Sequence, residues 1–225
     1  MKENKGQKGI ITGILVLGSF CGLVEVAAAG LLHRSGIHFS GLLIGLDALF
    51  IGIAMAVYGN PVMILGMGLL ACLHKQLVIP VLGLSVLCKA NACLAVLLEF
   101  GGLAGMTALF RGRVIKSRTA RSLASGTGVL FGSLLYYFIG MHVQPCSYML
   151  SFNGTSGLTA FIMKEGAVWA LSAGLFFMLG WEIGEKAKER TFGTWLQRPN
   201  SFYAGPGLLT LVSLLISAVI IYINK

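Results

Sequence analysis

The chain has 225 residues, of which 56% are hydrophobic and only 11% are charged. Soluble domains carry about 25% charged residues, so this composition excludes an ordinary soluble domain and predicts a protein with several membrane spans. The formal charge of +9 comes from short clusters of Lys and Arg beside the apolar runs, where basic residues orient helices, so it does not indicate nucleic-acid binding.

Apolar runs of about 20 residues, the length needed to cross a bilayer, predict an all-α bundle of seven transmembrane helices, with six as the alternative count. In chain order the predicted helices cover residues 10–32, 39–58, 61–82, 84–110, 120–143, 158–184 and 206–223. The third is expected to be short or broken, because Asn60-Pro61 precedes it and Pro80 lies near its end. Residues 1–225 then form one membrane domain, in which the aromatic and polar segment 191–205 is expected to lie as an interfacial loop.

Three basic clusters predict the orientation of the bundle. Lys2, Lys5 and Lys8 precede the first helix, RGRVIKSRTAR lies between the fourth and fifth, and EKAKER follows the sixth. With seven helices and a cytoplasmic N-terminus, all three clusters fall on the cytoplasmic side, as the positive-inside rule requires. We therefore expect a multi-pass protein of the cell membrane, the plasma membrane of a prokaryote, with its C-terminus outside.

Polar side chains within the apolar runs gather in the outer half of this arrangement. Glu25 and Asp47 are the most informative, because a buried carboxylate in a bilayer is costly and a short one cannot reach the interface. Together with Lys89, Asn91 and His142 they predict an outward-facing pocket for a small polar solute. In this interpretation Lys89 neutralises an outer-half carboxylate and Asn91 lines the pocket.

The alternative interpretation is that these polar groups have only a structural role at the membrane interface. Lys89, Lys164 and Glu165 lie close enough to predicted helix ends for their side chains simply to reach the interface. Glu99 falls in the inner half and is expected to be a structural hydrogen-bonding residue. A histidine at a helix end, such as His142, is also commonly an interfacial group.

Small residues predict a helix-packing face on the first helix. Gly18, Gly22, Glu25 and Ala29 follow at intervals of four, three and four, which places them on one side of a helix where a partner helix can approach closely. GxxxG pairs at Gly41/Gly45, Gly101/Gly105 and Gly128/Gly132 predict further close helix contacts.

Enzyme motifs are absent from these 225 residues. The sequence has no Walker A, HExxH or GxSxG pattern, which disfavours an ATPase, a metalloprotease or a serine hydrolase. The sequence predicts no cofactor, although its histidines leave two alternatives open. His74 and His142 are candidate axial ligands of a haem, and His33, His38, His74 and His142 are candidate ligands of a transition metal.

Two stretches, CGLVEVAAAGLL in the first helix and VYGNPVMILGMGLLACL around the third, resemble the substrate-binding S-component of energy-coupling factor (ECF) importers. The resemblance covers about residues 10–145 and carries no substrate signature. It implies that the chain captures a vitamin or metal, that its first helix docks on a transmembrane coupling subunit, and that cytoplasmic ATPases drive import. Two other classes stay open: a membrane-anchor or assembly subunit bound to other membrane subunits, and an integral-membrane enzyme or redox protein.

Overall fold

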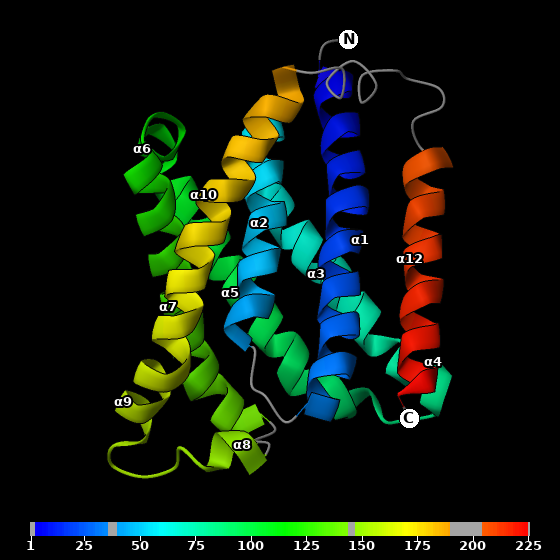
Figure 1. Ribbon diagram of the computed structural model, residues 1–225, viewed down its shortest axis with the longest axis vertical. Helices are drawn as coiled ribbons and strands as arrows, with labels where there is room; N and C mark the ends of the chain where they lie inside the picture. The colour runs from blue at the N-terminus through cyan, green and yellow to red at the C-terminus, as the bar shows by residue number, and fades with distance from the viewer. Residues whose placement is uncertain (1–2, 36–39, 144–146, 190–203, 225) are drawn as a thin grey trace.

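The computed structural model describes residues 3–35, 40–143, 147–189 and 204–224, and within these residues it is a helical bundle without strands (Figure 1). Seven helical spans among the described residues are long and apolar enough to cross a membrane, which confirms the predicted all-α bundle and makes the chain a multi-pass membrane protein. The spans cover Gln7–Ala27, Ser40–Tyr58, Val62–Leu82, Ala90–Leu109, Arg118–Val143, Gly157–Lys188 and Ala204–Ile223.

The helices follow one another with short connections. The first half contains α1 (Glu3–Ser35), α2 (Ser40–Tyr58), α3 (Val62–Gln76), α4 (Val78–Leu82), the 3-10 turn η1 (Val86–Lys89) and α5 (Ala90–Leu109). The second half contains α6 (Arg111–Lys116), α7 (Arg118–Val143), α8 (Ser147–Leu150), α9 (Gly157–Phe161), the π-helix η2 (Ile162–Gly166), α10 (Ala167–Glu189) and α12 (Ala204–Ile223).

The third span is broken, as the prolines predict. Gly59, with φ +62°, turns the chain out of α2 just before Pro61, and α3 then runs only to Gln76 before α4 continues from Val78. Glycine suits this turn because other residues rarely adopt a positive φ. Of the interfacial loop predicted over 191–205, residues 190–203 lie outside the described residues, while residues 204 and 205 already belong to α12.

Close backbone contacts pair α2 with α10. A Cβ atom added at Gly52 would meet the backbone of Phe177 and would lie 2.9 Å from the backbone nitrogen of Trp181 on α10. A Cβ at Gly180 would meet the backbone of Leu49 in return. The predicted Gly41/Gly45 pair faces the same helix, through Val168, Ser172 and Phe176. Small residues on both helices therefore allow this crossing.

The contact between α5 and α7 uses a glycine that the spacing argument did not select. A Cβ at Gly128 would lie 2.8 Å from the carbonyl oxygen of Gly102, and one at Gly132 would lie 2.9 Å from the Cα of Glu99. The predicted pair Gly101/Gly105 has nothing within 4 Å of the corresponding positions. The prediction for Gly128/Gly132 therefore holds, whereas on α5 the packing glycine is Gly102.

The small-residue face of α1 packs inside the bundle. A Cβ at Gly18 would lie 3.1 Å from the Cα of Met67 on α3, and one at Gly22 would collide with the ring of His74. This face of α1 therefore packs against α3 of the same chain at Gly18 and Gly22, while docking of α1 on a coupling subunit stays a prediction. The side chain of Ala29 lies outside the described residues.

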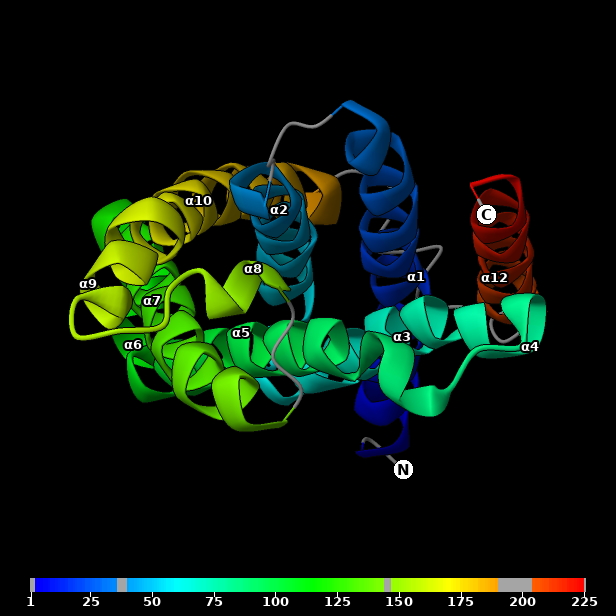
Figure 2. The same ribbon diagram turned by 90° about the horizontal axis from the view of Figure 1, so that it is seen from below.

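The last helix, α12, lies at one side of the bundle beside α1 (Figure 2). Its buried residues are Pro206 and three small residues with a hydroxyl group, Thr210, Ser213 and Ser217. The Ser19 hydroxyl of α1 donates a hydrogen bond of 3.1 Å to Thr210. Its remaining surface is apolar and exposed, as a lipid-facing helix requires, and includes Leu208, Leu211, Leu215 and Val219.

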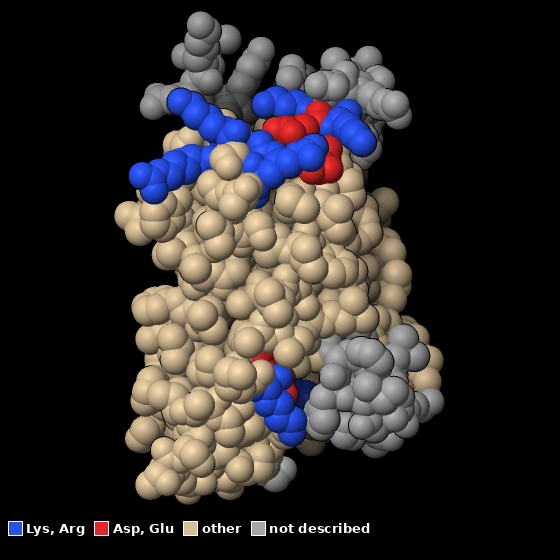
Figure 3. All heavy atoms as spheres, turned by 60° about the vertical axis from the view of Figure 1, so that its left-hand side comes forward, with Lys and Arg blue, Asp and Glu red and all other residues tan. Residues whose placement is uncertain are grey.

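Basic side chains gather at one end of the bundle, together with a few acidic ones (Figure 3). This is the end at which α1 begins, and α6 and the last turns of α10 also lie there (Figure 1). The positive-inside rule assigns it to the cytoplasm, so we call it the cytoplasmic end and the opposite one, near α8 and α9, the outer end.

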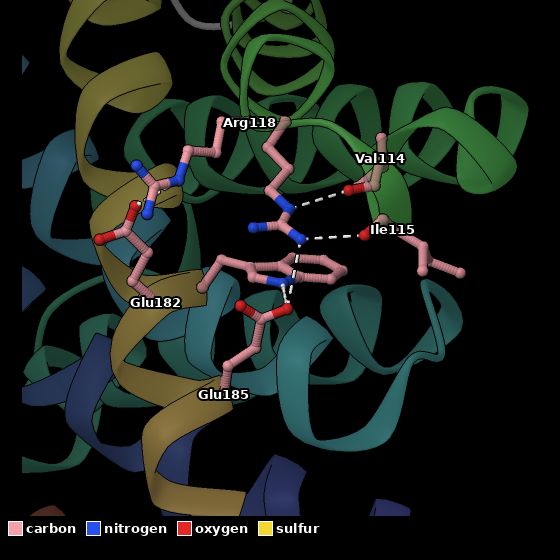
Figure 4. Close-up of polar contacts among 7 residues, drawn as sticks. Val114, Ile115, Arg118, Glu182 and Glu185 are labelled. Carbon is pink, nitrogen blue, oxygen red and sulfur yellow. Dashed lines mark hydrogen bonds and ion pairs between the residues drawn. The ribbon is translucent and has the colours of Figure 1, made fainter.

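A buried arginine, Arg121, joins three helices at the cytoplasmic end, where its partners Val114, Ile115 and Glu185 are labelled in Figure 4. Arg121 of α7 donates hydrogen bonds of 2.9 Å to the carbonyl oxygens of Val114 and Ile115, at the end of α6. The same guanidinium lies 3.2 Å from the carboxylate of Glu185 on α10 and 4.4 Å from the ring centre of Trp181. An exposed ion pair of 3.2 Å between Arg118 and Glu182 lies next to it.

Candidate functional site

A cavity of about 250 Å³ lies inside the outer half of the bundle. At the outer end it begins beside Ser40, the first residue of α2, and Tyr148 of α8. It reaches Glu99 in the middle of α5. Ionisable side chains inside a membrane bundle are rare and mark sites of binding or transport, so this cavity is the candidate site.

An ion pair forms one wall of the cavity. The Lys75 ammonium of α3 lies 2.5 Å from the carboxylate of Glu25 on α1, and both side chains are largely buried. Glu99 lines the same wall from α5 and is close enough to interact electrostatically with both charges. Three helices therefore bring two carboxyl groups and one ammonium group together.

A fourth ionisable group, Asp47 of α2, lies behind this wall. Its side chain is 2% exposed. Glu25, Glu99 and the thiol of Cys21 lie near enough to interact with it electrostatically. A void of about 10 Å³, roughly the size of one water molecule, is lined by both Asp47 and Glu99. Asp47 therefore adds negative charge next to the cavity without lining it.

At the outer end of the cavity, Glu165 accepts hydrogen bonds from three different elements. Its carboxylate accepts one of 2.6 Å from the Ser40 hydroxyl, one of 3.0 Å from the Trp169 indole nitrogen, and a third from the Tyr148 hydroxyl. The indole nitrogen also lies 2.9 Å from Ser40. All three donors are neutral, so they hold the carboxylate in place without supplying a compensating charge.

The π-helix η2 explains how Glu165 reaches the interior. Such π-turns insert an extra residue into a helix and occur frequently at functional sites. Within η2 the side chains of Met163 and Lys164 are exposed, whereas Glu165 is only 5% exposed. The local irregularity therefore separates two adjacent charged residues, and it places the acidic one in the cavity.

Aromatic side chains cover the rest of the outer part of the cavity. Tyr136, Phe161 and Trp169 line it, and the ring centroid of Phe161 lies 6.3 Å from that of Tyr136 and 5.8 Å from that of Trp169. Tyr148 adds a fourth ring to the lining. The cavity thus has an aromatic part next to Glu165 and a charged part at Glu25, Lys75 and Glu99.

The structure brings together only part of the predicted solute-binding set. Glu25 lines the cavity and Asp47 lies next to it, whereas Lys89 and His142 are exposed and do not line it. Lys75, not Lys89, neutralises Glu25. Asn91 does not line the cavity either; a Cβ at Gly140 of α7 would lie 3.0 Å from its side-chain oxygen. Solute binding by any of these residues stays a prediction.

The predicted histidine ligands do not form a metal site in the described residues. His74 is buried, with Nδ1 2.9 Å from the carbonyl oxygen of Leu70 and Nε2 3.0 Å from the hydroxyl of Ser213. His142 is exposed and bonds to the carbonyl oxygen of Phe138. His33 and His38 lie outside what the structure describes in side-chain detail. Among the described side chains, no group of three His, Cys, Asp or Glu is arranged to hold a metal ion.

Sequence reasoning missed Lys75, Glu99 and Glu165 as cavity residues. One signal was available for Lys75, because it lies toward the outer end of the predicted third helix, in the same half of the bundle as Glu25. No such signal existed for Glu165, since its inward direction depends on η2, and nothing in the sequence predicts a π-helix there.

Comparison of this chain with models of known protein families, with curated proteins and with solved structures gives no match.

Proposed function

We propose that the chain is the substrate-binding membrane subunit of an importer, which captures a small solute from the outer side in the cavity between Glu165 and Glu99. The observation that carries this proposal is the cavity itself: buried or largely buried ionisable groups from α1, α3, α5 and η2 line one cavity in the outer half of a membrane bundle. Stability does not explain these groups, because a buried ion pair often stabilises a fold no more than apolar side chains of similar volume do. Ionisable residues inside a membrane bundle instead mark sites of binding or transport.

The volume of the cavity limits the size of the solute. Typical pockets for drug-sized ligands measure about 300–1,000 Å³, so a cavity of about 250 Å³ fits a smaller molecule. Vitamin-like molecules and metabolites at the small end of their size range satisfy this limit. The mixed lining of aromatic rings and carboxyl groups suits a molecule with an apolar body and a polar group.

The driving force in this proposal comes from partner subunits. These 225 residues contain no Walker A sequence, so an importer built on this chain takes the energy of ATP hydrolysis from separate cytoplasmic ATPases through a membrane coupling subunit. The resemblance to ECF S-components supports that arrangement. Because α3 covers the glycine face of α1, the coupling subunit binds another surface of the bundle. The membrane is, in this proposal, the plasma membrane of a prokaryote.

Native mass spectrometry of the gently purified full chain tests the proposal. We expect a bound molecule of small mass in the wild-type protein, and we expect Ala95→Phe to abolish it, because Ala95 lines the cavity and a phenyl ring would fill it. Ala108→Phe is the matched control, since Ala108 lies on the same helix and is exposed. Equal retention in both variants, or no bound molecule in the wild type, would contradict solute capture. Stoichiometric membrane partners without a small molecule would instead support the anchor-subunit alternative.

A further inference from the structure

The charges around the cavity do not balance. Glu25 is paired with Lys75, and this leaves Glu99 and Glu165 on the lining and Asp47 directly behind it. Lys75 is the one Lys or Arg among the described side chains that line the cavity. Four carboxyl groups thus share one ammonium group in a region where water cannot screen them as it does at a surface.

The other lysine near this end does not correct the imbalance. Lys164 lies outside the lining, with an exposed side chain, and its ammonium is 5.8 Å from the ring centroids of Tyr148 and Phe152. The donors that hold Glu165 are two hydroxyls and an indole, all neutral. The carboxylate of Glu165 is therefore positioned but not compensated by charge.

The rings beside Glu165 suit a particular kind of counter-charge. The faces of Tyr, Phe and Trp rings carry negative electrostatic potential and attract ammonium groups, most strongly where water is excluded. Tyr136, Tyr148, Phe161 and Trp169 line the cavity next to this carboxylate. Rings of this kind also cover the apolar part of a ligand, so the lining combines both features of an amine carried on an apolar body.

We propose that the cavity selects small organic ammonium ions, and that Glu165 and Glu99 are the groups that select the positive charge. This inference rests on the proposed function, because it names the solute class of the same site. An anionic solute would be repelled by the carboxylate of Glu165, and a neutral one would leave that carboxylate without a counter-charge. Binding of an ammonium ion places its charge between the carboxylate and the ring faces.

A thermal-shift series on the purified full chain tests the inference with three probes of one shape: benzylammonium, benzyl alcohol and benzoate. At saturation we expect benzylammonium to raise the Tm by about 5 °C or more. The neutral and anionic probes should raise it much less. Glu165→Gln keeps the shape and an acceptor oxygen but removes the charge, and should raise the Kd for benzylammonium about tenfold or more.

Glu182→Gln is the matched control, because Glu182 belongs to the ion pair with Arg118 at the cytoplasmic end and does not line the cavity. It should leave the Kd unchanged. Equal stabilisation by all three probes, or by Na⁺ or K⁺ in place of benzylammonium, would overturn the selectivity while leaving solute capture intact. An unchanged Kd in Glu165→Gln would overturn the role of that residue. No response to any probe, together with no bound molecule by mass spectrometry, would overturn capture itself.

Discussion

Buried charged groups have different surroundings at the two ends of the bundle. At the cytoplasmic end, Arg121 is 6% exposed and its guanidinium is satisfied by two carbonyl oxygens, a carboxylate and an indole ring. In the outer half, Asp47 is also buried, near the carboxyl groups of Glu25 and Glu99, and carboxyl groups outnumber ammonium groups around the cavity. A fully satisfied charge stabilises a fold, whereas an excess of one sign provides a site for an ion that arrives from outside.

The largest effect on stability is expected at the satisfied end. Arg121→Met removes two charge-assisted hydrogen bonds to backbone carbonyls and the contact with Trp181, and should lower the free energy of unfolding by about 3 kcal/mol or more. Arg118→Met removes a guanidinium whose side chain is 74% exposed, and should change it by about 1 kcal/mol or less. Thermal unfolding in detergent measures both changes. Equal Tm values for the two variants would contradict the claim that buried Arg121 stabilises the protein more than exposed Arg118 does.

Lys75→Met should separate stability from binding. The variant leaves Glu25 without its partner, and we expect a loss of about 2 kcal/mol, limited because a carboxyl group can take up a proton in place of the lysine. The same variant removes the only ammonium on the described lining, but proton uptake by Glu25 removes a negative charge as well, so the Kd for benzylammonium should change little. Titration calorimetry measures this affinity; a weaker one would mean that Lys75 itself attracts the solute, as expected for an anion.

The rigidity of the cavity wall should depend on the crossing of α5 and α7 next to Glu99. Gly102→Val puts a side chain against the backbone of Gly128, and should destabilise the protein by about 1–2 kcal/mol. Gly101→Val on the same helix meets nothing within 4 Å and should be tolerated. Comparison of the two melting curves decides this, because tolerance at both positions would show that the helices do not approach closely there.

The smallest effect is expected at the exposed residues that the sequence had suggested for solute binding. Lys89→Met and His142→Ala change side chains outside the cavity, and each should alter stability by no more than about 0.5 kcal/mol and leave the Kd for benzylammonium unchanged. A tenfold loss of affinity in Lys89→Met would place the site nearer the start of α5.

The spans, their order and the break in the third were predictable because each depends on a local run of apolar residues or on a proline. The burial of Glu25 and Asp47 followed in the same way from their depth in apolar segments. What the sequence did not reveal is which turn of one helix faces which turn of another: Lys75 replaces Lys89 because α1 packs along α3. Glu165 points inward because η2 shifts the helix by one residue, a departure that no periodic pattern contains.

Diffraction from crystals of the protein with 4-bromobenzylammonium tests the central claim most directly, because the bromine atom marks the position of the ligand by its anomalous signal. The account predicts one strong peak in the cavity among Tyr136, Phe161 and Trp169, with the ammonium nitrogen at about 3 Å from the carboxylate of Glu165, the distance of a charge-assisted hydrogen bond. A peak confined to the cytoplasmic end or to the lipid-facing surface, or an empty cavity at a saturating concentration, would contradict it.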